Sequence, residues 1–248
     1  MRLIVATLTP FDRTAQVDHG QVREHLAFLA EGGVDGFAPT GTSGEFLYLS
    51  WAERRALHAT TLENAHGREV VPCVWDPSPG RAAELARAAE ADGAAAVFLP
   101  PPLYHVVGDE AVRRWYGAVR DAVALPVWAY DHPRTHNPIS VALWRQLVAD
   151  GVEAMKDSSG DPVRVSALAD ACPGRVYAGG DHLQGRAVEL GPCLGHISRQ
   201  ANLTPALCRR AVDGDAAARE ALMVELARGG GLVASKQRLG FGCRAPIA

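Results

Sequence analysis

Residues 152–171 read VEAMKDSSGDPVRVSALADA, and this stretch contains the pattern that decides the fold. The first six residues form a short apolar run that closes on a lysine and an aspartate, which predicts a strand. Residues 161–172, DPVRVSALADAC, predict an amphipathic helix. A strand followed by a longer helix is one βα unit, so the question is how often the unit recurs.

The same alternation runs through most of the chain. The strand candidates are apolar almost throughout, as expected for parallel strands covered on both faces. They span residues 3–7, 34–40, 69–75, 94–100, 125–130, 152–157, 175–180 and 194–199. The helical runs that follow the first seven span residues 18–33, 51–67, 79–93, 109–123, 140–150, 161–172 and 181–191.

Eight strands, each followed by a helix, predict an α/β fold, a (β/α)8 TIM barrel with a shortened C-terminal helical extension. We expect residues 1–204 to form the barrel core with the active site. Residues 205–248 are expected to hold the last barrel helix and a reduced helical segment. A doubly wound open sheet is the alternative, but no GxGxxG turn follows the first strand.

Composition narrows the class of protein. The 248 residues are 48% hydrophobic and 21% charged with a net charge of −3, which is ordinary globular composition without a basic surface for nucleic acid or membrane. The five cysteines form no CxxC pair, which disfavours a disulfide framework or structural zinc. The start, MRLIVATLTPFD, is too short and polar for a secretory leader, so we expect a cytoplasmic protein.

Lysine usage singles out one position. The chain has 23 arginines but only two lysines, Lys156 and Lys236. Lys156 closes the sixth strand, at the end of a barrel where active sites gather. A desolvated lysine has a lowered pKa, and its neutral amine can form a Schiff base with a carbonyl. The alternative is a salt bridge to Asp157 or another carboxylate, although an arginine would serve that purpose at least as well.

Two further features lie at predicted strand ends. Residues 39–46, PTGTSGEF, place Thr42 and Ser43 between two glycines, which suits either a carboxylate cradle or a plain βα turn. Tyr104 follows the fourth strand and Tyr130 ends the fifth, although the chain has only five tyrosines. They could relay a proton. Alternatively, tyrosine could simply be favoured at strand ends, where its apolar ring is buried and its hydroxyl reaches water.

Together these residues resemble the dihydrodipicolinate synthase / N-acetylneuraminate lyase family of class I, pyruvate-dependent aldolases. The resemblance runs in order from Thr9 to about residue 205. The motifs that carry it are Gly41-Thr42-Ser43-Gly44-Glu45, Tyr130-Asp131-His132-Pro133, Met155-Lys156-Asp157-Ser158-Ser159-Gly160-Asp161, Gly180-Asp181-His182 and Gly195-His196-Ile197-Ser198.

The resemblance implies a mechanism and a site. Lys156 would form an imine with the ketone of pyruvate or of a 2-oxo acid substrate, and Tyr130 would carry protons at the reacting oxygen. No metal or organic cofactor would be needed, because the imine on Lys156 is the electron sink. Ser43 would link Tyr130 to Tyr104, which in many relatives reaches across a subunit contact. The substrate-binding residues would be Thr42, Gly41, Gly180, Ile197, Asp181, His182, Ser198, Arg134 and Arg199.

The chain also departs from the family pattern. Asp131 stands where the family usually has Asn, His182 replaces an acid, and Arg199 follows Ser198 where smaller residues are common. Arg134 could replace the arginine that binds a second carboxylate, but only with a gap of one residue. The C-terminus is short, so the expected homo-oligomer could be a dimer or a tetramer.

Several functions fit this reading. The first is an aldolase or lyase that joins pyruvate to an aldehyde or cleaves a 4-hydroxy-2-oxo acid, of the keto-deoxy sugar acid or hydroxy-oxoglutarate type. Dihydrodipicolinate synthase, or a specialised biosynthetic aldolase, is the alternative within the family. Outside it are a non-catalytic barrel that binds a 2-oxo acid and a metal-dependent enzyme, with candidate ligands Asp131, His132, His136, His105, Asp181 and His182.

Overall fold

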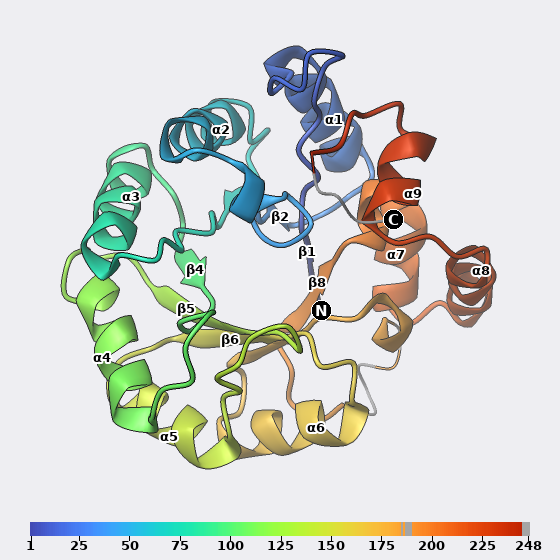
Figure 1. Cartoon of the computed structure of the whole chain (residues 1–248). Coiled ribbons are helices and arrows are strands. Elements are labelled where there is room, and N and C mark those ends of the chain that lie inside the picture. Colours follow the sequence, from blue (N-terminus) through green and yellow to red (C-terminus); the bar gives the residue numbers. More distant parts are fainter. Residues whose placement is uncertain (185, 187–189, 245–248) are drawn as a thin grey trace.

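The computed structural model describes residues 1–184, 186 and 190–244. Within them, eight short strands form one curled sheet that is surrounded by helices (Figure 1). The strands are β1 Arg2–Val5, β2 Gly36–Phe37, β3 Glu69–Val70, β4 Val97–Leu99, β5 Val127–Asp131, β6 Ala154–Asp157, β7 Val176–Ala178 and β8 Gly195–Ser198. Each lies inside a range predicted from the sequence or extends one residue beyond it.

The sheet closes into a barrel. Its strand order is β3-β2-β1-β8-β7-β6-β5-β4, and every neighbouring pair is parallel. A parallel bridge between Cys73 and Phe98 joins the chain after β3 to β4. The backbone N–H of Val74 also donates to the carbonyl of Phe98 at 3.0 Å. The predicted (β/α)8 barrel is therefore confirmed, and the open-sheet alternative is wrong.

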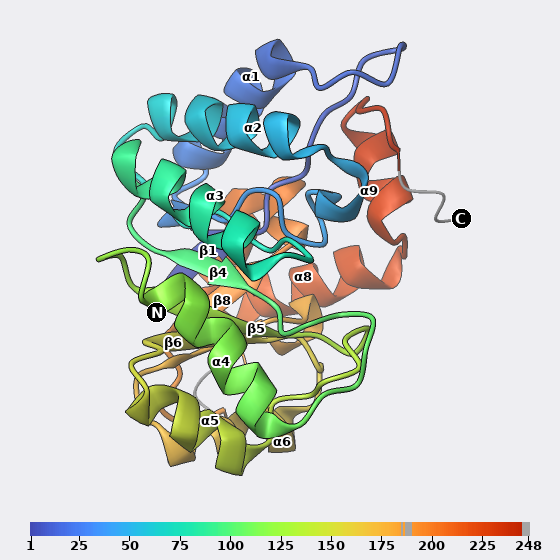
Figure 2. The same ribbon diagram turned by 60° about the vertical axis from the view of Figure 1, so that its left-hand side comes forward.

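Helices cover the barrel on its outer side, and Figure 2 shows α2, α3 and α4 along one flank. The α-helices of the described residues are α1 His19–Glu31, α2 Trp51–Glu63, α3 Pro79–Ala91, α4 Asp109–Arg120, α5 Val141–Ala149, α6 Pro162–Ala171, α7 Pro205–Val212, α8 Ala216–Ala227 and α9 Leu232–Arg238. None of the helices in the described residues has the length and apolarity that a membrane span requires.

Local sequence explains where several helices begin. Ser50 accepts a hydrogen bond from the N–H of Glu53, and the Glu53 side chain accepts one from Ser50, which completes the capping box that the sequence predicts. Asp18 caps α1, and Pro79 occupies the first turn of α3. These caps satisfy backbone N–H groups that the helix cannot pair internally.

One predicted helix, over residues 181–191, is not confirmed by the part of that range that the structure describes. Of residues 181–191, the described part contains only a 3-10 turn, η2 Asp181–Leu183, while residues 185 and 187–189 lie outside the described residues. Gly180 has φ of 91°, and the Asp181 side chain accepts hydrogen bonds from the Ser198 hydroxyl and the N–H of Arg199, so residues 181–183 form a 3-10 turn instead of the first turn of an α-helix.

Two apolar clusters hold the barrel together. One joins the barrel interior to the helices α3 to α6, and the other packs β1 and β2 against α1, α2, α7 and α8.

Two short turns, η1 Phe46–Tyr48 and η3 Gln200–Asn202, follow the ends of β2 and β8. The helices α8 and α9 lie beside α7 at the edge of the ring. The boundary predicted at residue 204 stays a prediction.

Candidate active site

Lys156 lies inside the barrel near its carboxyl end. It is the third residue of β6 and is 6% exposed. Its Nζ lies 4.6 Å from the centre of the Tyr130 ring, and Tyr130 is its direct neighbour in the β5–β6 register. Among the described residues, no carboxylate forms an ion pair with it. The salt bridge to Asp157 that the sequence left open is therefore wrong, since Asp157 pairs with Arg164 instead.

Burial changes the acid–base behaviour of this lysine. Desolvation lowers the pKa of Lys156 to about 8, against a smaller opposing effect of the Asp181 carboxylate. With that pKa, roughly one-tenth of the amine is neutral at pH 7, far more than for a lysine in water. Lys156 therefore has a usable nucleophilic population near neutral pH.

Tyr130 presents its hydroxyl beside this amine. It is 2% exposed, and its Oη lies 3.0 Å from Thr42 Oγ1. Burial raises the pKa of Tyr130 to about 12, although hydrogen bonds to Thr42 and Ser158 act in the opposite direction. The phenol therefore stays protonated at neutral pH and can give a proton to a reacting oxygen and take it back.

The loop after β2 holds Thr42 in place. A Cβ at Gly44 would lie 2.8 Å from the backbone nitrogen of Thr40, so only glycine fits this turn. Thr40 has φ of 54°, and its hydroxyl lies 2.7 Å from His58 Nε2. The family resemblance implies that the Ser43 hydroxyl links the two tyrosines. In the structure it is the Thr42 hydroxyl that contacts Tyr130, while Ser43 lines the cavity.

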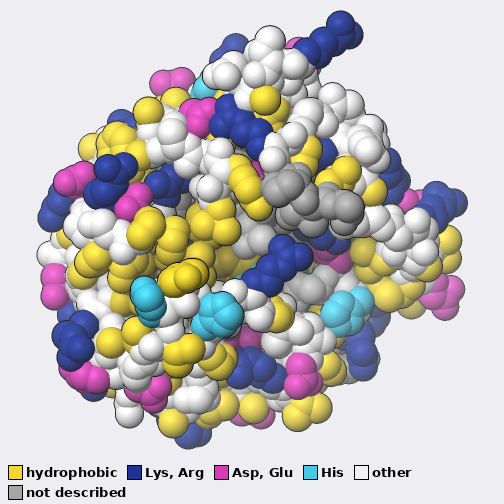
Figure 3. Space-filling view, in the orientation of Figure 1, with side chains coloured by type: hydrophobic (Ala, Val, Ile, Leu, Met, Phe, Trp, Pro, Cys, Tyr) yellow, Lys and Arg dark blue, Asp and Glu magenta, His cyan; other side chains and the backbone are white. Residues whose placement is uncertain are grey.

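These groups border a cavity of about 610 Å³ at the barrel mouth. Figure 3 shows a hollow on this face, with hydrophobic side chains along one rim and basic and histidine side chains along another. Nine of the predicted substrate-binding and catalytic residues other than Lys156 line it. They are Thr42, Ser43, Tyr130, Arg134, Gly180, Asp181, His182, Ile197 and Arg199.

Three predicted residues do not line this cavity. Tyr104 is 86% exposed, and its ring packs edge-on against His105 at 4.9 Å. Ser198 is buried and donates to Asp181 at 2.8 Å, so within this chain it supports a lining residue. Gly41 lies behind Thr42, where a Cβ would meet the Phe98 ring at 3.2 Å.

The cavity rim carries an excess of basic groups. Arg134 and Arg199 line it together with His132 and His182. The Asp181 carboxylate offsets only part of this charge: its Oδ1 accepts hydrogen bonds from the Ser198 hydroxyl and the backbone N–H of Arg199, and its Oδ2 lies 3.9 Å from Arg199 Nη2. Burial, with Lys156 and Arg134 nearby, lowers the pKa of His132 to about 4, so this ring is neutral at pH 7.

The sequence missed part of the cavity wall. Ser158 lies two residues beyond Lys156, so its motif position was a usable signal. Leu226, Gly231 and Leu232 come from α8, α9 and the segment between them. No motif marks these residues, because they reach the mouth only through the packing of the C-terminal helices.

The metal-site alternative receives no support from the described residues. They contain no group of three or more His, Cys, Asp or Glu side chains placed to hold an ion. Asp131 pairs with Arg164, and His182 Nε2 lies 3.0 Å from the carbonyl of Gly160. These two candidate ligands are thus engaged in other contacts.

Comparisons with known proteins show what this chain is similar to in sequence and in fold. The model of the dihydrodipicolinate synthetase family matches residues 1–227. A 4-hydroxy-tetrahydrodipicolinate synthase of Pelobacter propionicus is 32% identical over 215 residues, which are 85% of this chain and 73% of that protein. The enzyme of the same name from Methylacidiphilum fumariolicum has a TM-score of 0.89 and 27% identity, and the match covers 100% of this chain and 89% of that chain.

A third match concerns the fold alone. The 2-keto 3-deoxygluconate aldolase from Picrophilus torridus has a TM-score of 0.87 over 99% of this chain and 96% of that chain, with 22% sequence identity. The barrel and its C-terminal helices are therefore shared with an aldolase as well as with synthases.

Proposed function

The chain belongs to the dihydrodipicolinate synthetase family and is a pyruvate-dependent lyase, and we propose that Lys156 is its Schiff-base residue. The observation that carries this proposal is the buried amine of Lys156 beside the Tyr130 ring, with no carboxylate paired to it among the described residues. The other lysine, Lys236, is paired with Glu45 and is not among the residues that line the cavity.

The proposed reaction begins with attack of the neutral Lys156 amine on the ketone carbon of pyruvate. Loss of water gives a protonated imine, which withdraws electrons so that C3 can release a proton and form an enamine. The enamine carbon then adds to an aldehyde, and water releases the 4-hydroxy-2-oxo acid from the lysine. The reverse sequence cleaves that acid. The imine supplies the electron sink, so these steps need no metal or organic cofactor.

We assign the proton transfers to Tyr130. Its protonated phenol can give a proton to the oxygen that leaves the ketone and to the alkoxide formed from the aldehyde. The contact with Thr42 supports a relay through that hydroxyl rather than through Ser43. Thr42 and Ser43 then bind the pyruvate carboxylate with hydroxyl and N–H donors, and the backbone at Gly180 and Ile197 borders the same pocket.

The basic rim supports an aldehyde partner that carries a negative charge. Arg134 and Arg199 both line the cavity. Arg199 Nη2 lies 3.9 Å from the Asp181 carboxylate, whereas Arg134 has no carboxylate partner among the described residues, so Arg134 in particular is placed to meet a second carboxylate. We therefore favour a 4-hydroxy-2-oxo acid of the hydroxy-oxoglutarate type, or an acidic keto-deoxy sugar acid. Formation of 4-hydroxy-tetrahydrodipicolinate is the alternative, supported by the names of the relatives.

We further propose a cytoplasmic homo-oligomer, in which Tyr104 reaches the mouth of a second copy. Tyr104, Val106 and Leu47 are exposed apolar side chains, at 86%, 79% and 59%. Large exposed apolar groups of this kind commonly mark association surfaces. A relay residue that is exposed in one chain is consistent with a site completed by its partner.

Borohydride trapping tests the central assignment. The wild-type protein is incubated with pyruvate, reduced and digested, and the adduct is located by mass spectrometry. We expect an adduct on Lys156 and none on Lys236, which serves as the internal control because the chain has no other lysine. The variant Lys156→Arg should give no adduct. An adduct on Lys236, or none from any of a panel of 2-oxo acids, would refute the assignment.

Substrate class is tested separately on the same protein. Cleavage of a dicarboxylic 4-hydroxy-2-oxo acid is compared with that of a neutral-tailed analogue of equal chain length. We expect the dicarboxylic acid to be preferred, and Arg134→Gln or Arg199→Gln to raise its KM while leaving the KM of the analogue unchanged. Equal use of both acids by the wild-type protein would refute the acidic-partner proposal.

A further inference from the structure

An aspartate follows each of the two central residues of the site. Tyr130 precedes Asp131, and Lys156 precedes Asp157. In the β5–β6 register Tyr130 lies beside Lys156, and Asp131 lies beside Asp157. Because successive side chains of a strand point to opposite faces, the two carboxylates lie behind the site.

These carboxylates are buried next to each other. Asp131 is 5% exposed and Asp157 is 0% exposed. Burial raises the pKa of Asp131, and the neighbouring Asp157 charge acts in the same direction. Two adjacent buried carboxylates repel each other and favour separation of the strand ends unless a cation lies between them.

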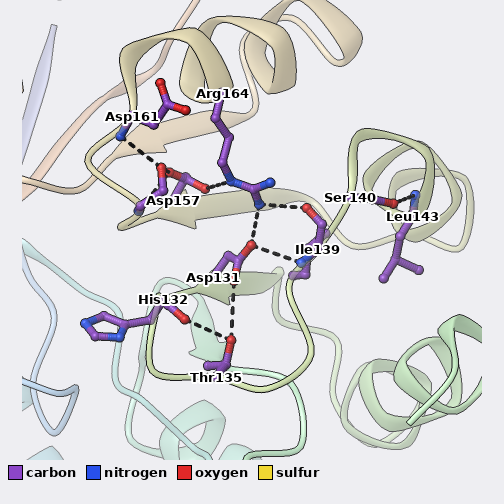
Figure 4. A network of polar contacts seen from close by, with 10 residues as sticks. Asp131, His132, Thr135, Ile139, Ser140, Leu143, Asp157, Asp161 and Arg164 are labelled. Atoms are coloured by element: carbon purple, nitrogen blue, oxygen red, sulfur yellow. Dashed lines mark hydrogen bonds and ion pairs between the residues drawn. The ribbon is translucent and has the colours of Figure 1, made fainter. Parts of the chain in front are cut away.

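Arg164 of α6 supplies that cation, as Figure 4 shows. Its Nε donates to Asp157 Oδ2 at 2.8 Å, and its Nη2 donates to Asp131 Oδ2. The same Nη2 donates to the carbonyl of Ile139 at 2.7 Å. One planar guanidinium thus contacts the ends of both strands and the loop between β5 and α5, which a lysine ammonium could not do with the same geometry.

The backbone extends this connection. The N–H of Ile139 donates to Asp131 Oδ2 at 2.9 Å, and the N–H of Ser158 donates to the carbonyl of Asp131 at 2.9 Å. The loop held in this way carries His132 and Arg134, which line the cavity. The position of Arg164 is therefore connected to the amine, the phenol and the basic rim, although Arg164 itself does not line the cavity.

We propose that Arg164 is a positioning residue, which sets the spacing of Tyr130 and Lys156 by holding Asp131 against Asp157. This inference rests on the proposed function, in which Lys156 forms the imine and Tyr130 transfers the proton. Imine formation tolerates a displaced phenol, because water can replace Tyr130 as the proton donor to the oxygen that leaves the ketone. The later proton transfer needs the phenol at the correct distance from the substrate bound to Lys156, so it is the step that depends on the spacing.

The test separates these two steps. Wild-type protein, Arg164→Lys and Arg164→Gln are compared by borohydride trapping with pyruvate and by steady-state cleavage of the preferred 4-hydroxy-2-oxo acid. We expect trapping on Lys156 to persist in both variants, KM to change little, and kcat to fall about 100-fold, as displacements of about 1 Å can cause. The exposed arginine of α5 provides the control Arg145→Gln, which should leave kcat within twofold of wild type.

A double variant distinguishes positioning from general loss of stability. If Arg164 acts through Asp131, then Arg164→Gln with Asp131→Asn should lower kcat no more than Arg164→Gln alone. Asp131→Asn alone should lower kcat less, because its amide oxygen can still accept from Arg164 and from the N–H of Ile139. The Asp131→Asn variant also allows the proposal to be tested if the Arg164 variants fail to fold.

The outcomes are distinct from those of the proposed function. If the wild-type protein gives no adduct on Lys156, the proposed function fails first. If wild type is trapped and Arg164→Lys keeps kcat within twofold, the positioning role is refuted. Should the Arg164 variants not fold, an Asp131→Asn kcat equal to wild type would refute it instead. Additive losses in the double variant would also refute it, because Arg164 and Asp131 would then act independently.

Discussion

The second lysine of the chain offers the sharpest test of how the site is supported. Lys236, in α9, is 1% exposed and forms an ion pair with Glu45, which is 2% exposed. Its Nζ also lies 4.4 Å from the centre of the Phe11 ring. Glu45 has φ of 60° and belongs to the loop that carries Thr42. The C-terminal segment is thus attached to the loop that contacts Tyr130.

The substitution Lys236→Met keeps most of the apolar stem and removes the ammonium. Breaking a buried ion pair by removing one partner costs about 3–5 kcal/mol in the free energy of unfolding. The backbone N–H of Arg244 still donates to Glu45 Oε2 at 2.9 Å, so we take the lower end, about 3 kcal/mol. For a domain of this size that corresponds to a fall in Tm of about 6–12 °C.

Thermal unfolding followed by circular dichroism measures this change. The matched control is Arg238→Met on the same helix, whose partner Glu225 and own side chain are 17% and 43% exposed. Such a partly exposed pair contributes at most about 1 kcal/mol, so the control should shift Tm by no more than about 4 °C. The double variant Lys236→Met with Glu45→Gln should be more stable than Lys236→Met alone, since no buried charge is then left without its ammonium partner. Equal Tm values for Lys236→Met and Arg238→Met would refute the reasoning.

Three further predictions concern the chemistry. Lys156→Arg should abolish turnover and trapping while Tm stays within a few degrees of wild type, and loss of the folded circular dichroism spectrum would instead make the lysine structural. The rate of trapping should rise with pH and level off above about pH 8, because only the neutral amine attacks and burial lowers the pKa of Lys156 to about 8; a rate that is flat from pH 6 to 9 would contradict this. Tyr130→Phe should lower kcat by about 10²–10⁴-fold while the adduct still forms, as expected for loss of an acid–base group, and an unchanged kcat would remove Tyr130 from the mechanism.

The sequence by itself determined the architecture and singled out the residues proposed as the centre of the site. Apolar periodicity is a local property, so eight strand ranges and most helices could be read from it, including the capping box at Ser50. The scarcity of lysine singled out Lys156, and the motif at residues 39–46 marked the loop that contacts Tyr130. The strand, helix and loop signals are each local to one short stretch, and the scarcity of lysine is read directly from the composition.

Only the tertiary structure decided which distant groups meet. Arg164 contacts Asp131 from 33 positions away, and Lys236 contacts Glu45 from 191 positions away. The choice of Thr42 over Ser43 as the partner of Tyr130 depends on the turn that Gly44 permits, and Leu226 and Leu232 reach the cavity only because α8 and α9 pack beside the barrel. Such contacts depend on strand register, helix packing and loop geometry together, and no short stretch of sequence encodes their combination.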